Sequence, residues 1–295
     1  MEQSESDLIK VSRDPPGSAV AVITINRPKS LNSLTRPMIV SLARHIRLLD
    51  SDPTVAVLIL TGAGDRAFCS GVDLTAAESV FKGDVKDPLS DPICQLHACS
   101  KPVIGAINGY AVTAGFEIAL ACDILVAGKD AKFIDTHAKF GIFPSWGLSQ
   151  KLSRIIGPMR AREVSLTAMP VTAQMAEKWG LVNHVVERNS GALDKAKEIA
   201  EAIIKNNRNL VLKYKAVIND GFSLDLRSAL ALEKERAHSY YDGMTKDQFA
   251  MMQKFIQGLR LAVAKVPISQ LSSFGLKEYL SCLSANLEAP SFSAS

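Results

Sequence analysis

The stretch from Lys101 to Ala127 constrains the fold of this chain most, because it holds two strands and a helix in close succession. Pro102–Ile107 and Asp123–Ala127 are apolar runs of strand length, and an apolar helix follows Glu117 between them. The turn before this helix, Thr113-Ala114-Gly115, has so little side-chain bulk that a ligand can approach its backbone N–H groups closely. A carboxylate beside such donors suits chemistry in which negative charge develops on an oxygen while a proton moves. Taken alone, the pattern also fits an ordinary strand-to-helix turn with a solvated glutamate.

A second segment has a similar layout. Val55–Leu60 reads as a buried strand and continues through Gly62 and Gly64 into the sequence AFCSGVDL at 67–74. Two such turns, each able to offer one backbone N–H, form the minimum oxyanion hole for a carbonyl oxygen. The two segments together therefore indicate a catalytic site.

Strands and helices alternate over the first half of the chain, which predicts an α/β core. Besides the strands already given, we expect a strand at 19–26 and a helix at 36–50. From Ala161 onward the pattern is almost wholly helical, with expected helices at 173–179, 192–205, 210–219 and 226–241 and one short strand at 181–186.

Two segments have the composition of loops or extensions. Lys82–Pro92 is charged and contains two Asp-Pro steps, which predicts a mobile surface loop. The last stretch, 258–295, is rich in Ser and Leu. Its segment 276–287 fits an amphipathic helix, and the alternative is a largely disordered extension.

Composition excludes several classes of protein. The 295 residues are 47% hydrophobic and 22% charged, which is ordinary for a soluble globular protein of one large or two smaller domains. The net charge of +4 is spread along the chain, so it suits an anionic ligand but does not argue for nucleic acid. The five cysteines have no metal-binding spacing and indicate reduced intracellular thiols. We find no apolar run of membrane-spanning length, and the acidic N-terminal segment is neither a secretory signal nor a transit peptide.

Four motifs, in order and at matching spacing, resemble the enoyl-CoA hydratase/isomerase family, also called the crotonase superfamily. They are ITINRPKSLNSL at 23–34, AFCSGVDL at 67–74, KPVIGAINGYAVTAGFEIALACDILVA at 101–127 and FGIFPSWGLSQKLSRIIG at 140–157. The resemblance covers roughly residues 7–257. It implies an α/β fold, a spiral of ββα units with a helical C-terminal region that mediates trimer formation. We therefore expect a core at 1–160 with the active site, a helical region at 161–257 and an atypical tail at 258–295.

The resemblance implies catalytic roles for four residues. The oxyanion donors would be the N–H groups of Val72 and Ala114, and Glu117 matches the first of two glutamates that hold the attacking water in family hydratases. The second glutamate falls where this chain has His137, the main departure from the family. An imidazole, with an ordinary pKa of about 6.5, can also accept or donate a proton and hold water, but it can equally fill a partly buried polar position. If these residues lie on a strand, Asp135 shares a face with His137 and can orient its ring.

The resemblance also implies a site for coenzyme A and an acyl pocket. Residues matched to cofactor contacts are Lys29, Ser70, Gly71, Val72, Asp73, Leu74, Gly115 and Lys254. Each lysine alone also reads as a solvated surface charge, and Asn32 and Asp73 read more simply as partners of loop backbone groups. Phe143, Trp146 and Leu148 fall where the family lines its acyl pocket, and they fit a plain core as well.

The function implied is that of an enoyl-CoA hydratase, a hydro-lyase acting on 2-enoyl-CoA thioesters in fatty-acid β-oxidation. The coenzyme A is part of the substrate, and no metal or redox cofactor is expected. The alternatives are a 3-enoyl-CoA to 2-enoyl-CoA isomerase, whose commonest form carries its carboxylate at the position of His137, and a weakly catalytic CoA- or RNA-binding member.

The expected partners are an acyl-CoA thioester and further copies of the chain in a homotrimer or hexamer, without nucleic acid or membrane. The chain resembles plant-type peroxisomal monofunctional members in particular. Such members often end in a signal of the Ser-Lys-Leu type, whereas this chain ends in Ser293-Ala294-Ser295, which leaves the cytoplasm as the alternative location.

Overall fold

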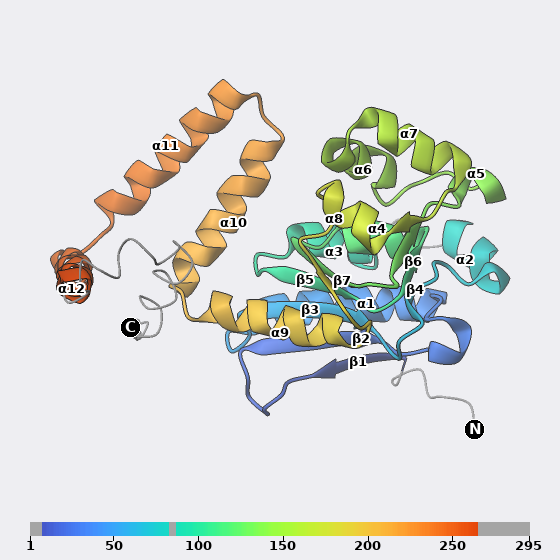
Figure 1. Ribbon diagram of the computed structural model, residues 1–295, viewed down its shortest axis with the longest axis horizontal. Helices are drawn as coiled ribbons and strands as arrows, with labels where there is room; N and C mark the ends of the chain where they lie inside the picture. The colour runs from blue at the N-terminus through green and yellow to red at the C-terminus, as the bar shows by residue number, and fades with distance from the viewer. Residues whose placement is uncertain (1–7, 83–86, 265–295) are drawn as a thin grey trace. The chain divides into compact units, whose positions relative to one another are not determined.

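The structure is a computed structural model that describes residues 8–82 and 87–264 (Figure 1). The chain divides into two compact units, 1–212 and 213–295. The domain boundaries expected at residues 160 and 257 stay predictions, and the helix expected at 276–287 lies outside the described residues.

The described residues of the first unit form two sheets. The strands are β1 (Ile9–Ser12), β2 (Val20–Ile25), β3 (Val57–Gly62), β4 (Ala67–Cys69), β5 (Val103–Ile107), β6 (Tyr110–Val112), β7 (Ile124–Gly128), β8 (Lys132–Ile134), β9 (Val171–Thr172) and β10 (His184–Val186). The order in the larger sheet is β1-β2-β3-β5-β7-β10, and in the smaller one β4-β6-β8-β9. In the larger sheet only β1 pairs antiparallel to its neighbour, with Ile9 opposite Ile25, and β2, β3, β5, β7 and β10 run parallel.

Helices connect the strands. They are α1 (Arg36–Ser51), α2 (Ala77–Lys82), α3 (Pro92–Ala98), α4 (Ala114–Leu120), α5 (His137–Phe140), α6 (Leu148–Ile156), α7 (Pro158–Thr167), α8 (Ala173–Lys178), α9 (Gly191–Ile204), α10 (Arg208–Phe222), α11 (Leu226–Asp242) and α12 (Lys246–Ala264). Two short 3-10 helices, η2 (Pro28–Ser30) and η3 (Leu74–Ala76), lie in the loops after β2 and β4.

The first unit repeats one pattern along the chain. In the pairs β3-β4, β5-β6 and β7-β8, the first strand enters the larger sheet, the second enters the smaller one, and helical structure follows. Each repeat therefore turns the chain once and stacks beside the previous repeat, because the equivalent strands pair in parallel. This is the spiral of ββα units that the family resemblance implies.

Apolar side chains pack against both faces of the larger sheet. One face is covered by α9 (Figure 1). This helix packs through Ala192, Ala196 and Ala200 against side chains of β2, β3, β5 and β7. The small alanines allow the helix to approach the strands closely. On the other face lies the main core, to which α1, α3, α4 and the smaller sheet contribute. The sheet is thus buried on both sides, as is usual for parallel sheets.

The described part of the second unit, residues 213–264, contains the end of α10, then α11 and α12. An ion pair of 2.6 Å joins Arg236 of α11 to Asp220 of α10. Large apolar side chains such as Tyr214, Phe222 and Leu226 stay exposed, and neither α10 nor α11 has a buried residue.

The structure corrects one expectation about local structure. Asp135 and His137 do not share a strand, because β8 ends at Ile134 and His137 is the first residue of α5. The carboxylate Oδ1 of Asp135 accepts the backbone N–H of His137 at 3.0 Å, which closes a turn in place of an extended strand.

Candidate active site

The two small-residue turns predicted from the sequence meet in the folded chain. A Cβ atom added to Gly115 would lie 2.0 Å from the carbonyl oxygen of Cys69, so the first turn of α4 can sit against the end of β4 only with a glycine there. A Cβ added to Gly71 would lie 3.7 Å from the backbone nitrogen of Ala114. The loop after β4 and the start of α4 therefore form one surface of backbone atoms.

Each turn leaves one N–H available at this surface. Leu34 pairs with Val72 in a parallel bridge, in which Leu34 N–H donates to Gly71 and Asp73 N–H donates to Leu34, each at 2.8 Å. In that pattern the N–H of Val72 points away from Leu34. Ala114 is the first residue of α4, where an N–H has no acceptor within the helix. Val72 and Ala114 both line the same pocket.

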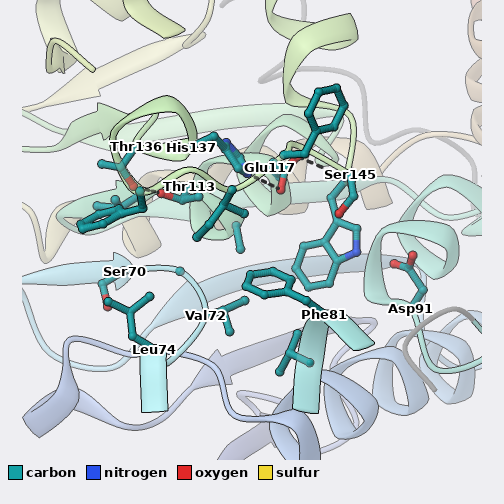
Figure 2. A pocket seen from close by; sticks show the side chains of 18 residues that line it. Ser70, Val72, Leu74, Phe81, Asp91, Thr113, Glu117, Thr136, His137 and Ser145 are labelled. Atoms are coloured by element: carbon teal, nitrogen blue, oxygen red, sulfur yellow. Dashed lines mark hydrogen bonds and ion pairs between the residues drawn. The ribbon is translucent and has the colours of Figure 1, made fainter. Parts of the chain in front are cut away.

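The residue before Ala114 has an unusual backbone. Thr113 has φ of 50° and ψ of −109°, in a region that β-branched residues rarely adopt. Its hydroxyl hydrogen-bonds the hydroxyl of Thr136, which directly precedes His137 (Figure 2). The turn that carries Ala114 is thus tied to the turn that carries His137.

Glu117 is buried in the wall of the pocket, with only 2% of its surface exposed. One carboxylate oxygen, Oε1, accepts the backbone N–H groups of Trp146 at 2.9 Å and of Leu148 at 3.3 Å. Burial raises the pKa of the Glu117 carboxyl above its ordinary value, although the charge of His137 and the two N–H bonds act in the opposite direction. A carboxylate held in this way is suited to accept a proton.

His137 faces Glu117 across the pocket wall. Its Nε2 lies 3.8 Å from Oε2 of Glu117 (Figure 2). Its Nδ1 lies 2.7 Å from Oδ1 of Asp135. All three side chains are buried. Burial raises the pKa of Asp135, but the hydrogen bonds from His137 and Ser165 outweigh it, and the net pKa is lowered. The three groups form a row, Asp135–His137–Glu117, that ends at the pocket.

The pocket has a cavity volume of about 510 Å³ and combines hydroxyl groups with apolar side chains. In Figure 2, Ser70 and Leu74 lie on one side and Asp91 lies on the opposite side, with Glu117 and His137 above. The remaining residues that line it are Gly71, Val72, Val80, Phe81, Val112, Thr113, Ala114, Thr136, Phe140, Ile142, Phe143, Ser145 and Trp146. Such a pocket can hold an acyl group beside the two N–H donors.

The residues expected to contact coenzyme A have different positions. Ser70, Gly71, Val72 and Leu74 line the pocket, whereas Gly115 is packed against Cys69 behind it. Asp73 pairs with Arg27 at 2.5 Å, and its hydrogen bonds with Thr75 and Arg27 lower its pKa to about 2.

The two lysines are exposed. Lys29 lies in η2, and Lys254 lies on α12 in the second unit. The interpretation of Asn32 as a loop residue is confirmed, because it bonds the backbone of Arg27, Ala63 and Ala67.

Two of the three residues expected in the acyl pocket line it. Phe143 is 87% exposed, Trp146 is buried, and both line the cavity. Leu148 lies in the core and contributes its N–H to Glu117 instead. Sequence reasoning missed Val80 and Phe81 of α2, whose only sequence signal is two apolar residues after the 67–74 motif.

The reactive side chains in the described part of the chain include no candidate metal site. Across residues 8–82 and 87–264, no three His, Cys, Asp or Glu side chains gather as metal ligands would. Burial raises the pKa of the Cys69 thiol to about 12, so this side chain is a poor nucleophile. In the same part of the chain, no helix combines the length and apolarity that crossing a bilayer requires.

A family model described as enoyl-CoA hydratase/isomerase matches residues 16–257. The chain belongs to the enoyl-CoA hydratase/isomerase family. It is 68% identical over 259 residues to the Arabidopsis thaliana protein named "Probable enoyl-CoA hydratase 1, peroxisomal", which covers 88% of this chain and 96% of the relative. It is 38% identical to the short-chain-enoyl-CoA hydratase of Clostridium acetobutylicum, over 81% of this chain and 91% of that protein. The crystal structure of an enoyl-CoA hydratase from Bacillus anthracis matches with a TM-score of 0.76 at 33% identity and covers 85% of this chain and 96% of that chain.

These comparisons confirm the family and the fold that the four motifs predicted. The enoyl-CoA hydratase/isomerase family model spans the motifs from Ile23 to Gly157 and continues through α10 and α11. The mixed α/β architecture with a helical C-terminal region is that of solved enoyl-CoA hydratases.

Proposed function

We propose that this chain is an enoyl-CoA hydratase, a hydro-lyase that adds water across the double bond of 2-enoyl-CoA thioesters in fatty-acid β-oxidation. Family membership and the 68% identical relative that carries this name support the proposal. The observation that carries it is the juxtaposition of Glu117 and His137, 3.8 Å apart, in a pocket that also presents the turns of Val72 and Ala114.

The two backbone N–H groups are the proposed oxyanion hole. When water attacks the β-carbon of a 2-enoyl thioester, negative charge moves to the thioester oxygen. The N–H groups of Val72 and Ala114 stabilise that charge, and each is expected to lower the barrier by about 3 kcal/mol. The small residues of both turns allow the thioester to reach these donors.

Glu117 is the proposed base. Its Oε1 is held by two backbone N–H groups, so Oε2 is the oxygen left to take a proton from water. As the water oxygen bonds to the β-carbon, one water proton passes to Oε2 and the double-bond electrons move toward the thioester oxygen. The enolate then takes that proton back at its α-carbon, which leaves Glu117 ionised and the 3-hydroxyacyl thioester complete. His137 holds the water on its other side.

The thioester supplies the activation that a metal or redox cofactor would provide elsewhere, so we propose that the enzyme needs neither. Lys29 and the 70–74 loop are the proposed contacts to the coenzyme A part of the substrate. The lysine matches its anionic phosphates in charge, and Ser70, Gly71, Val72 and Leu74 of the loop line the pocket.

The proposal also includes the oligomeric state and the cellular location of the protein. Exposed Tyr214, Phe222 and Leu226 on the C-terminal helices are suited to contact other copies, which supports a homotrimer or a hexamer of two trimers. The name of the Arabidopsis relative supports a peroxisomal location.

Product analysis with crotonyl-CoA and a 3-enoyl-CoA, run side by side on the purified protein, tests the function. We expect rapid formation of 3-hydroxybutyryl-CoA and slow or no conversion of the 3-enoyl substrate. Efficient isomerisation without hydration would replace the proposal by the isomerase alternative. Failure to turn over either substrate, with coenzyme A thioester binding retained, would favour the weakly catalytic alternative.

A further inference from the structure

Asp135 is a buried carboxylate that the proposed reaction does not use. It is 2% exposed, and its oxygen Oδ1 accepts from both the backbone N–H of His137 at 3.0 Å and the ring Nδ1 at 2.7 Å. The hydroxyl of Ser165 also bonds this carboxyl. A buried charge is costly unless it is paired and hydrogen-bonded, and these hydrogen bonds offset the cost of burying the Asp135 carboxylate.

These contacts determine which ring nitrogen of His137 carries the proton. An ionised carboxylate only accepts hydrogen bonds, and the hydrogen bonds from His137 and Ser165 hold the pKa of Asp135 below its ordinary value. Nδ1 must therefore donate, and it carries the hydrogen. When the ring is neutral, Nε2 then has no hydrogen and can only accept.

The ring is also fixed in direction. The same Oδ1 atom bonds the backbone N–H and the ring Nδ1, so a rotation of the ring by 180° would break the 2.7 Å bond. In the observed orientation Nε2 lies 3.8 Å from Oε2 of Glu117. Two acceptors thus face one position in the pocket wall, and a water within about 2.8 Å of both fits there.

This arrangement has a consequence for the nucleophile. A water that donates one hydrogen to Oε2 of Glu117 and the other to Nε2 of His137 has both lone pairs directed away from these side chains. If Nε2 carried a hydrogen instead, it would bind one of the two lone pairs of the water and leave a single pair for the attack on the β-carbon.

We infer that Asp135 is a positioning residue, which holds His137 in the Nδ1–H tautomer so that the water between His137 and Glu117 presents its lone pairs to the substrate. The inference rests on the proposed hydratase function. Asp135 does not touch the substrate and acts through His137. The charged groups within ion-pair distance of the ring, among the residues that the structure describes, are Asp135 and Glu117.

Nitrogen-15 NMR of the wild-type protein labelled in histidine tests the tautomer without reference to activity. In the neutral ring of His137 we expect a proton on Nδ1 and none on Nε2, with the signals assigned by their loss in His137→Ala. A wild-type ring with the proton on Nε2 would overturn the inference. Because this measurement needs no substrate, it stands even if the proposed function fails.

Asp135→Ala tests the consequence for turnover. An asparagine would keep its carbonyl oxygen toward the backbone N–H and Nδ1, whereas alanine removes the acceptor of the Nδ1 hydrogen. The ring then favours the tautomer with its hydrogen on Nε2, toward the Glu117 carboxylate, so kcat for crotonyl-CoA should fall by about 10²-fold or more with KM within about threefold. Asp194→Ala, at an exposed position of α9, is the matched control and should behave as wild type.

Combining the variants separates positioning from a structural role. If Asp135 acts through His137, then Asp135→Ala should add less than about twofold to the loss in a His137→Ala background. Independent losses that multiply in the double variant would contradict the inference. So would an Asp135→Ala enzyme with unchanged kcat.

Discussion

Replacing Glu117 by glutamine removes the proposed base and keeps the hydrogen bonds that hold the side chain. The two groups bonded to Oε1 are the backbone N–H donors of Trp146 and Leu148. Since both are donors, the glutamine must place its carbonyl oxygen there and turn its NH₂ toward Nε2 of His137. The water position then loses its proton acceptor, and kcat for crotonyl-CoA should fall by about 10²- to 10⁴-fold with KM within about threefold.

The same substitution has a predictable effect on stability. Burial raises the pKa of Glu117 above its ordinary value of 4.5, against the charge of His137 and the two N–H bonds. The native protein therefore holds this proton more tightly than the unfolded chain does. The stability from this group is present below pH 4.5 and is lost as the pH rises through the native pKa. A glutamine at position 117 does not titrate, so the variant does not lose stability in this way as the pH rises.

Two assays check this prediction. Steady-state hydration gives kcat and KM, and thermal unfolding at about pH 5 and about pH 8 gives the difference in Tm between variant and wild type. The Tm of Glu117→Gln relative to wild type should be greater at about pH 8 than at about pH 5. Glu201→Gln, at an exposed position of α9, is the control and should change neither quantity. Near-normal turnover by Glu117→Gln would refute the assignment of the base.

The remaining predictions concern the histidine, a glycine and a buried lysine. His137→Ala should lose most hydration activity, and His137→Glu, which restores the family's pair of carboxylates, should retain it; equal activity of wild type and both variants would make the imidazole a spectator. Gly115→Ala places a Cβ 2.0 Å from a backbone oxygen, so it should displace the Ala114 donor and lower kcat by about 10²-fold; an unchanged kcat would argue against that donor. Lys101→Met should lower the free energy of unfolding by about 2–4 kcal/mol in urea titrations, because the buried Nζ bonds two carbonyls at 2.5 and 2.6 Å; a loss under about 0.5 kcal/mol would contradict this.

Light scattering tests the assembly. The family resemblance predicts a trimer or a hexamer at micromolar concentration, and the exposed apolar side chains of α10 and α11 are suited to form its contacts. A mass of one chain, 31.8 kDa, would refute that prediction.

The larger elements of the fold could be predicted from the sequence because their patterns are long. Apolar runs gave the strands at β2, β3, β5 and β7, and helical spacing gave α1 and α9 within two residues of the observed bounds. The strands β4, β6, β8 and β9 contain two or three residues each, too few to show a period. Of these strands, β4 and β6 fall within the 67–74 and 101–127 motifs, whereas β8 and β9 lie outside all four motifs.

The candidate site was predicted in its residue types and less well in its geometry. Glycine and alanine in the two turns indicated the backbone donors, since close approach requires small residues. The turn at Asp135 was missed because a side-chain oxygen bonds the His137 N–H, and a strand pattern does not reveal such a bond. The positive φ of Thr113 also could not be expected, since it depends on packing that joins the turn to Thr136.

A crystal structure of the Glu117→Gln variant with crotonyl-CoA would test the central claim most directly. The measured quantities are the distances from the thioester oxygen to the backbone nitrogens of Val72 and Ala114. The account predicts both at about 2.7–3.1 Å, with the β-carbon facing the side chains at positions 117 and 137. A thioester oxygen beyond hydrogen-bond reach of either nitrogen, with the acyl group seated in the pocket, would contradict it.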